Sequence, residues 1–344
     1  MNTLRSTVAA IALSATALLG STLPAAAAAP VLEAGTQAFV DAVAASGGKP
    51  IYSLSYEEAR NVLAGAQAQK LASAATQVQD TSFPAGPTGK VNVRIVRPAG
   101  AKGDLPVVMY FHGGGWVMGD RNTHDHLIRE LAAAAQAAVV FVDYDRAPEF
   151  KFPAINEQAY AAVEYVAQHG KSLGLDGSRL AVAGDSAGGN MAASITLLAK
   201  ERKGPKISHQ LLFYPVTDDV SANASYQAFG EGPWLTEKAM HYFLDATFPA
   251  DTRNSPIAFP LKADVEQLRG LPPATILVAE NDLLREEGEA YGRKLTQAGV
   301  SVMSTRYNGT IHDFVMLNGL ANTPAAKAAI AQGAAALKAA FAAK

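Results

Sequence analysis

The sequence predicts an α/β fold in which a mostly parallel central sheet is flanked by helices. Short apolar runs, typical of strands buried on both faces, alternate with longer segments of helical spacing. These runs include residues 106–111, 180–183, 210–215 and 274–280. The second run leads through a Gly-x-Ser-x-Gly turn into a helix, and this strand-to-helix context is typical of a nucleophilic serine.

The turn at residues 184–190 reads Gly-Asp-Ser-Ala-Gly-Gly-Asn. It is expected to be so tight that a side chain at Gly184 or Gly188 would collide with neighbouring backbone. Ser186 is then held in a strained conformation with its hydroxyl exposed above the sheet. Ala187 opens the helix, so its N–H lacks a partner within the helix and can bind an anion. The alternative is a glycine-rich turn with an incidental serine.

Composition and charge exclude several classes of function. The chain has 344 residues, 49% of them hydrophobic, and a formal net charge of −2. Nothing in this balance suggests nucleic acid or an anionic membrane as a partner. The chain has no cysteine, so a thiol nucleophile and a thiolate metal site are excluded.

Residues 1–28 are predicted to be a signal peptide. Arg5 supplies the basic start, residues 8–19 form the apolar core, and the small residues 25–29 offer cleavage sites. The apolar core is too short to span a bilayer comfortably, which argues against an uncleaved anchor. We therefore expect an exported protein, periplasmic or secreted, without stable membrane insertion after cleavage. Residues 29–344 would form a single domain.

Residues 29–80 are predicted to form a helical cap or arm. Ser55 and Glu58 have the spacing of a capping box, which predicts a helix over residues 56–71. The residues leave open whether this segment is part of a lid or only packs against the domain. Residues 91–96 alternate in polarity, as an edge strand does.

A buried strand ends in His112, which three consecutive glycines follow. Consecutive glycines let backbone N–H groups point into a cleft with no side chain in the way. The N–H groups of Gly113 and Gly114, or of Gly114 and Gly115, would join that of Ala187 in stabilising an oxyanion. His112 itself is expected to orient its surroundings rather than to act as the base.

These motifs resemble the hormone-sensitive-lipase family of α/β-hydrolases, also called HGGG-type bacterial esterases. The resemblance rests on residues 112–116, residues 184–190 and the stretch Asp-Tyr-Asp-Arg-Ala-Pro-Glu at residues 143–149. That last stretch departs at Asp145 and Arg146 from the Asp-Tyr-Arg-Leu-Ala-Pro-Glu common in the family. The resemblance covers about residues 90–320 and implies an α/β-hydrolase fold with a helical cap and an ester-hydrolysing activity.

The candidate acid and base follow the last two predicted strands. Asp282 lies on the loop after the first of these strands, on the same rim as the serine turn. A helix N-cap is the alternative role for Asp282, and Glu280 is a weaker rival for the acid. His312 lies on the loop after the final strand. The order Ser186, Asp282, His312 matches the order expected for α/β-hydrolases.

Residues 216–261 contain no predicted strand, in contrast to the regular succession of strands before and after them, and are predicted to form a cap insertion. Thr236 is expected to be the N-cap of a helix in this insertion. Candidates for lining the substrate pocket are Trp116 beside the glycine loop and, in the insertion, Trp234, Tyr242, Phe243 and Phe248. Each aromatic residue of the insertion would serve equally well as part of the core.

His124 and His126 suggest a metal site at first sight. Residues two apart on a helix do not share a face, so both are expected to be surface or loop residues. No metal and no other cofactor is expected.

Taken together, the motifs predict a serine carboxylic-ester hydrolase. His312 would take the proton of Ser186, Asp282 would orient the imidazole, and an acyl-enzyme would form and be hydrolysed. Small-molecule esters with short- to medium-chain acyl or aryl groups are the expected substrates. An amide or carbamate hydrolase, a long-chain lipase and a non-catalytic ligand-binding protein are the alternatives. The sequence leaves the oligomeric state open.

Overall fold

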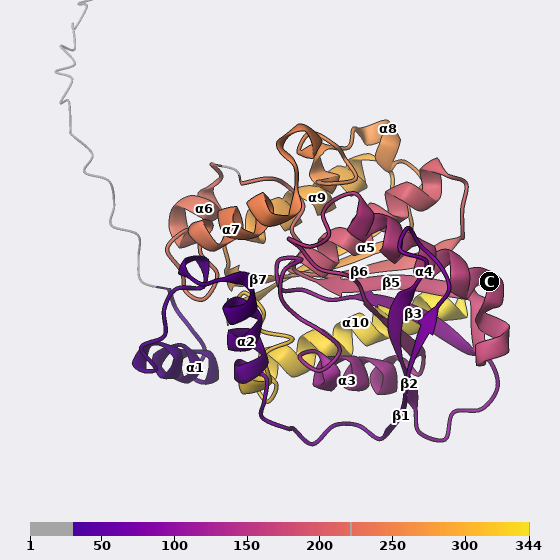
Figure 1. Cartoon of the computed structure of the whole chain (residues 1–344), viewed down its shortest axis with the longest axis horizontal. Helices are drawn as coiled ribbons and strands as arrows, with labels where there is room; N and C mark the ends of the chain where they lie inside the picture. The colour runs from indigo at the N-terminus through magenta and orange to yellow at the C-terminus, as the bar shows by residue number, and fades with distance from the viewer. Residues whose placement is uncertain (1–29, 221, 344) are drawn as a thin grey trace, which may run out of the picture.

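The computed structural model describes residues 30–220 and 222–343 and has the predicted α/β architecture (Figure 1). At its centre lies one sheet of eight strands in the order β1-β2-β4-β3-β5-β6-β7-β8. The β1–β2 and β2–β4 pairs are antiparallel and the other pairs are parallel. The strands are β1 (Thr76–Phe83), β2 (Val91–Pro98), β3 (Leu105–Phe111), β4 (Ala138–Asp143), β5 (Leu175–Asp185), β6 (Ile207–Phe213), β7 (Ala274–Asn281) and β8 (Val302–Ile311).

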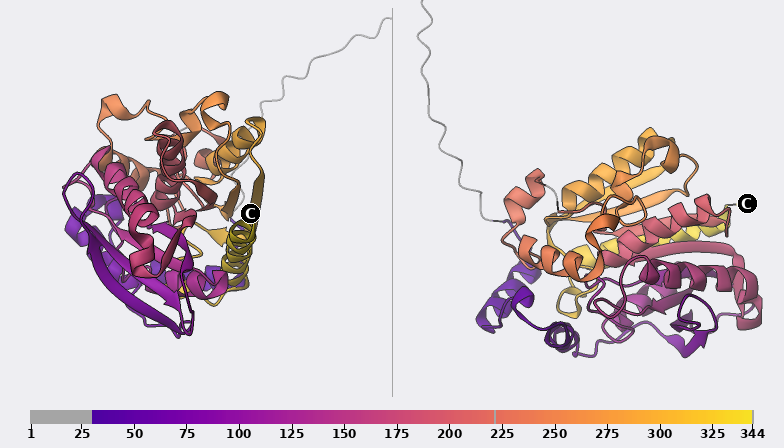
Figure 2. Two further views of the ribbon diagram at one scale, coloured as in Figure 1. Left: turned by 90° about the vertical axis from the view of Figure 1, so that its right-hand side faces the viewer. Right: turned by 45° about the horizontal axis from the view of Figure 1, so that its top comes forward.

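Two layers of helices cover the sheet (Figures 1 and 2). On one face lie α3 (Asp125–Ala135) and α10 (Pro324–Ala342), and on the other α4 (Ala154–His169), α5 (Ala187–Glu201) and α9 (Arg285–Gln297). The remaining α-helices are α1 (Ala34–Ala45), α2 (Tyr56–Ala66), α6 (Ala224–Phe229), α7 (Glu237–Thr247) and α8 (Val265–Leu268). Short 3-10 turns are η1 (Ile51–Ser53), η2 (Gly170–Leu173), η3 (Ala250–Thr252), η4 (Pro260–Lys262) and η5 (Asn318–Leu320).

The register of the central strands brings the two glycine motifs together. β3 and β5 are parallel neighbours, and Phe111 at the end of β3 is paired with Gly184 at the end of β5. The glycine loop and the serine turn therefore begin side by side, at the carboxyl ends of these two strands. β3 and the second half of β5 are buried and mostly apolar, as expected for strands that helices cover on both faces.

The edge of the sheet differs from the prediction. β2, which contains the predicted edge strand at residues 91–96, lies between β1 and β4, so β1 is the edge. β1 is mostly polar and exposed and lacks the apolar alternation that marks a strand. Its pairing with β2 holds it in place, aided by an ion pair of 2.7 Å between Asp80 and Arg94 on facing positions. The capping box at Ser55 is present, but α2 ends at Ala66 rather than at residue 71.

The amino-terminal helices and the insertion after β6 lie at the same end of the molecule (Figure 1). The Tyr242 hydroxyl on α7 donates to the Leu54 carbonyl at 3.2 Å, and its ring lies 4.8 Å from that of Tyr56 on α2. The predicted signal peptide, residues 1–28, lies outside the described residues. Within residues 30–220 and 222–343, no helix has the length and apolar character needed to cross a membrane.

Candidate active site

Ser186 lies at the turn between β5 and α5, and its backbone φ is +53°. Non-glycine residues rarely adopt such a conformation, and it is strained. A Cβ atom on Gly184 would collide with the carbonyl of Gly188, and one on Gly188 would collide with that of Phe111. The two glycines therefore allow the turn to close against β3, as predicted.

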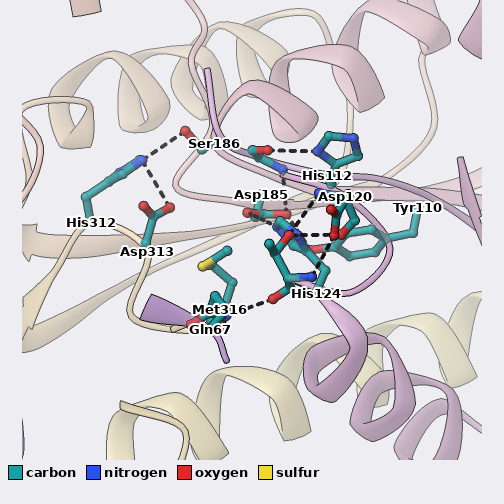
Figure 3. Close-up of polar contacts among 12 residues, drawn as sticks. Gln67, Tyr110, His112, Asp120, His124, Asp185, Ser186, His312, Asp313 and Met316 are labelled. Atoms are coloured by element: carbon teal, nitrogen blue, oxygen red, sulfur yellow. Dashed lines mark hydrogen bonds and ion pairs between the residues drawn. The ribbon is translucent and has the colours of Figure 1, made fainter. Parts of the chain in front are cut away.

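The structure brings Ser186, His312 and Asp282 into one chain of hydrogen bonds (Figure 3 shows the first two). His312 Nε2 lies 2.9 Å from Ser186 Oγ, and His312 Nδ1 lies 2.7 Å from Asp282 Oδ2. All three residues are buried. The backbone N–H of Leu284 donates to the other oxygen of Asp282 at 2.9 Å. Glu280, the rival acid, instead accepts a hydrogen bond from a backbone N–H at the end of β8.

The environment of His312 favours its protonated form. Burial lowers the pKa of the imidazole, but the carboxylates of Asp282 and Asp313 outweigh burial and raise the pKa to about 9. Asp313 was not expected at the site. Its Oδ1 lies 3.4 Å from His312 Nε2, and the only sequence signal for this contact is its position directly after His312.

The glycine loop differs from the prediction at its first residue. The N–H of Gly113 donates to Asp185 Oδ1 at 3.1 Å and is therefore not free to bind an oxyanion. Gly114 and Gly115 line the cavity that also contains Ser186. Their N–H groups and that of Ala187 remain the candidate oxyanion donors.

Asp185 anchors the glycine loop, and Figure 3 shows its carboxylate close to Tyr110 and His124. Besides Gly113, its carboxylate accepts a hydrogen bond from the Tyr110 hydroxyl at 2.6 Å and lies 3.3 Å from His124 Nε2. His124 lies in the turn before α3, which agrees with the predicted loop position, but it is fully buried rather than at the surface. Burial opposes ionisation of both groups, but their mutual attraction outweighs it. The pKa of His124 is raised and that of Asp185 is lowered.

The other two histidines considered in the sequence have structural contacts. His112 stacks on the Tyr144 ring at 4.1 Å, and its Nδ1 lies 2.8 Å from the Gly113 carbonyl. Burial lowers the pKa of His112 to about 3, so the imidazole is neutral and Nδ1–H donates to the glycine loop. His126 Nδ1 lies 2.8 Å from the Ser73 hydroxyl. In the described part of the chain, no three His, Cys, Asp or Glu side chains are grouped to hold a metal ion.

A cavity of about 430 Å³ opens onto Ser186 and His312, and its lining is mainly apolar. Of the aromatic candidates, Trp116, Trp234 and Phe243 line it, whereas Tyr242 and Phe248 are not among its lining residues. Trp116 is fully buried and packs edge-on against a second ring, so it belongs equally to the core. The amino-terminal segment supplies further lining residues that sequence patterns did not single out: Val40, Val43, Ile51, Tyr52, Val62 and Leu63.

The fold and this arrangement of side chains are those of an α/β-hydrolase. A family model described as alpha/beta hydrolase fold matches residues 108–316, and the chain belongs to this family, in its hormone-sensitive-lipase-like branch.

Relatives and solved structures define the class of activity. Esterase LipI of Mycobacterium tuberculosis is 42% identical over 255 residues, which cover 74% of this chain and 79% of that protein. Carboxylesterase NlhH of the same species is 41% identical over 250 residues, covering 72% and 78%. The crystal structure of a thermostable esterase from Pseudomonas putida has a TM-score of 0.89 at 49% identity, covering 92% and 99%. The chain is a carboxylic ester hydrolase. This rules out the alternative of a non-catalytic ligand-binding protein.

Proposed function

We propose that the enzyme hydrolyses esters through a covalent acyl-enzyme on Ser186. Its main support is the hydrogen-bonded chain from Ser186 through His312 to Asp282 at the base of an apolar cavity. Neutral His312 takes the Ser186 proton as Oγ attacks the ester carbonyl carbon. Asp282 fixes the tautomer with the proton on Nδ1 and stabilises the imidazolium that forms.

The oxyanion of the tetrahedral intermediate would be bound by backbone N–H groups of Gly114, Gly115 and Ala187. The N–H of Ala187 is suited to this because it lies at the first turn of α5, where the helix dipole also favours negative charge. Collapse of the intermediate passes the proton from His312 to the leaving alcohol. A water molecule, activated by the same imidazole, then releases the acid.

The proposed substrates are esters with short- to medium-chain acyl or aryl groups. A cavity of about 430 Å³ with an apolar lining suits such groups. A relative from Pseudomonas putida that is 35% identical over 284 residues is named an ethyl acetate hydrolase, in line with a small substrate. Residues 29–80 and 216–261 would act as the cap over this cavity, and export through the predicted signal peptide would place the enzyme outside the cytoplasm.

A series of 4-nitrophenyl esters from acetyl to palmitoyl tests the proposal. We expect turnover to be fastest on short chains and to be lost in Ser186→Ala, whereas Ser172→Ala, at an exposed serine of η2, retains it. A phosphonate that labels serine nucleophiles should add its mass to the wild type and to Ser172→Ala only.

Other outcomes would redirect the proposal. Rates that increase toward palmitoyl would indicate a lipase, and faster turnover of anilides than of matched esters would indicate an amidase. Turnover that persists in Ser186→Ala would refute the assigned nucleophile.

A further inference from the structure

Asp313 places a second carboxylate beside His312, next to the ring nitrogen Nε2 that faces Ser186. Its Oδ1 lies 3.4 Å from His312 Nε2, the atom that also lies 2.9 Å from Ser186 Oγ (Figure 3). Its side chain is 17% exposed and lines the same cavity as Ser186 and His312. The triad gives this carboxylate no role.

Trp234 holds the Asp313 carboxylate in this orientation. The indole Nε1–H donates to Asp313 Oδ2 at 2.8 Å, which leaves Oδ1 to face His312 Nε2. The indole ring also packs against Phe39 of α1, with ring centroids 5.3 Å apart. One oxygen of the carboxylate is therefore tied to the segment between α6 and α7, and the other is available at the site.

The distance between Asp313 Oδ1 and His312 Nε2 suits a shared water molecule. At 3.4 Å the two atoms are too far apart for a strong charge-assisted hydrogen bond, which is about 2.7–2.9 Å long. A water molecule bound to Nε2 from the cavity is within reach of both. We propose that Asp313 positions the water that hydrolyses the acyl-enzyme, an inference that rests on the proposed acyl-enzyme at Ser186.

In this step the water donates one O–H to His312 Nε2 and the other to Asp313 Oδ1. Its oxygen forms a bond to the acyl carbon while Nε2 takes the first proton. The second proton stays on the oxygen, which becomes the hydroxyl of the acid product. When the intermediate collapses, the bond between the acyl carbon and Ser186 Oγ breaks and His312 returns its proton to Oγ. Asp313 only accepts a hydrogen bond.

An alcohol in the place of this water would gain nothing from Asp313. Its single O–H must donate to His312 Nε2, so no hydrogen is left for Asp313 Oδ1. Asp313 should therefore favour water over alcohols as the acceptor of the acyl group. Both acceptors react with the same acyl-enzyme through the same base. The ratio of their products is therefore insensitive to the pKa of His312, which separates the positioning of water from an electrostatic effect.

The test is the competition between water and 1-propanol for the acetyl group of 4-nitrophenyl acetate. The measured quantity is the ratio of acetic acid to propyl acetate at a fixed alcohol concentration. Asp313→Gly removes the carboxylate and suits the backbone φ of +65° at this position. We expect its ratio to fall about tenfold, the effect of losing a hydrogen bond to a charged acceptor.

Further variants make the test specific. In Asp313→Asn the indole N–H of Trp234 should donate to the amide oxygen, which leaves the NH₂ group to face His312 Nε2. The ratio of acetic acid to propyl acetate should therefore fall as well. This variant also keeps the volume and backbone preference of aspartate if Asp313→Gly fails to fold. Trp234→Phe removes the N–H but keeps a ring against Phe39, and its ratio should fall less. Asp104→Asn, at an exposed loop carboxylate, should leave the ratio unchanged.

The outcomes distinguish this inference from the proposed function. An unchanged ratio in folded Asp313→Gly and Asp313→Asn, with both products formed by the wild type and neither by Ser186→Ala, overturns the role of Asp313 alone. No propyl ester from either Asp313 variant also overturns the role of Asp313, because an alcohol should compete better once that carboxylate is gone. Wild-type protein that acquires no phosphonate label would overturn the proposed mechanism together with this inference.

Discussion

Asp185→Asn should weaken both the fold and the oxyanion loop, because Asp185 combines three buried contacts. The substitution keeps the shape of the side chain. The amide oxygen can still accept from the Tyr110 hydroxyl and the Gly113 N–H, as Oδ1 does now. The NH₂ group then replaces Oδ2 and faces His124 Nε2, at a site where the carboxylate now lies 3.3 Å away. The ion pair is lost and His124 must become neutral.

The expected loss in the free energy of unfolding is about 2 kcal/mol, less than that of an ion pair broken to leave an unpaired charge. Breaking a buried ion pair costs ~3–5 kcal/mol when the remaining charge stays unpaired. The loss here is smaller because His124 can release its proton and accept a hydrogen bond from the new amide. Displacement of the Gly113 peptide should also lower kcat by about tenfold, because small misplacements of oxyanion donors are costly.

The loss should depend on pH in a defined direction. The pKa of His124 is raised above its ordinary 6.5, so its contribution is complete below pH 6.5 and disappears as pH rises through the folded-state pKa. The pKa of Asp185 is lowered from 3.8, so its contribution is complete above that pH and disappears as pH falls through the folded-state value. The difference between wild type and variant should be largest between these two ordinary values and should shrink at alkaline pH.

Urea unfolding followed by circular dichroism from pH 5 to 9 measures this difference, with Asp104→Asn as the control at an exposed carboxylate. We expect the gap between wild type and Asp185→Asn to narrow above pH 6.5 while the control stays near the wild type. A gap that is constant or widens over this range would refute the assignment of a buried ion pair.

Three further predictions concern the triad and the loop. Asp282→Asn should lower kcat by about 10⁴-fold, because an amide N–H facing His312 Nδ1 favours the wrong tautomer; steady-state rates within tenfold of wild type would exclude Asp282 as the acid. Burial lowers the pKa of His312, but Asp282 and Asp313 raise it to about 9. Because the base must be neutral, kcat/KM should increase with pH up to about 9, and a plateau starting near pH 6.5 would contradict this. A Cβ on Gly115 would lie 2.5 Å from Phe243 Cδ1, so Gly115→Ala should lower kcat/KM at least tenfold, and the added Phe243→Ala should restore part of it. No restoration in the double variant would show that the collision is not the cause.

The features that the sequence predicted well are those that local chemistry determines. Gly184 and Gly188 are required because no Cβ fits between the serine turn and β3, and a strand-turn-helix pattern signals this directly. The cap of α2 depends on residues three apart, and the buried strands depend on continuous apolar runs. The position of Asp282 and His312 near Ser186 could be predicted because the loops that follow parallel strands lie at the same end of the sheet.

The features that sequence patterns missed depend on contacts between distant residues. The rule that residues two apart do not share a helix face says nothing about His124, which is the N-cap of α3 and reaches Asp185, 61 positions away. The N–H of Gly113 is engaged by that same carboxylate, and no pattern in the loop reveals it. The sequence patterns did not predict β1, because this polar edge strand is held by its pairing with β2 rather than by a buried apolar face.

Ser186 and His312, the proposed nucleophile and base, are each next in sequence to an aspartate. These two aspartates contact different parts of the molecule. Asp185, directly before Ser186, holds the glycine loop, which in our proposal stabilises every tetrahedral intermediate. Asp313, directly after His312, is tied to Trp234 between α6 and α7, and in our proposal it serves only the attack of water. Asp185→Asn should therefore slow acylation and deacylation alike, whereas Trp234→Phe should slow deacylation more than acylation. Rapid-mixing experiments with 4-nitrophenyl acetate would separate the two, because a larger burst relative to turnover is expected only for Trp234→Phe.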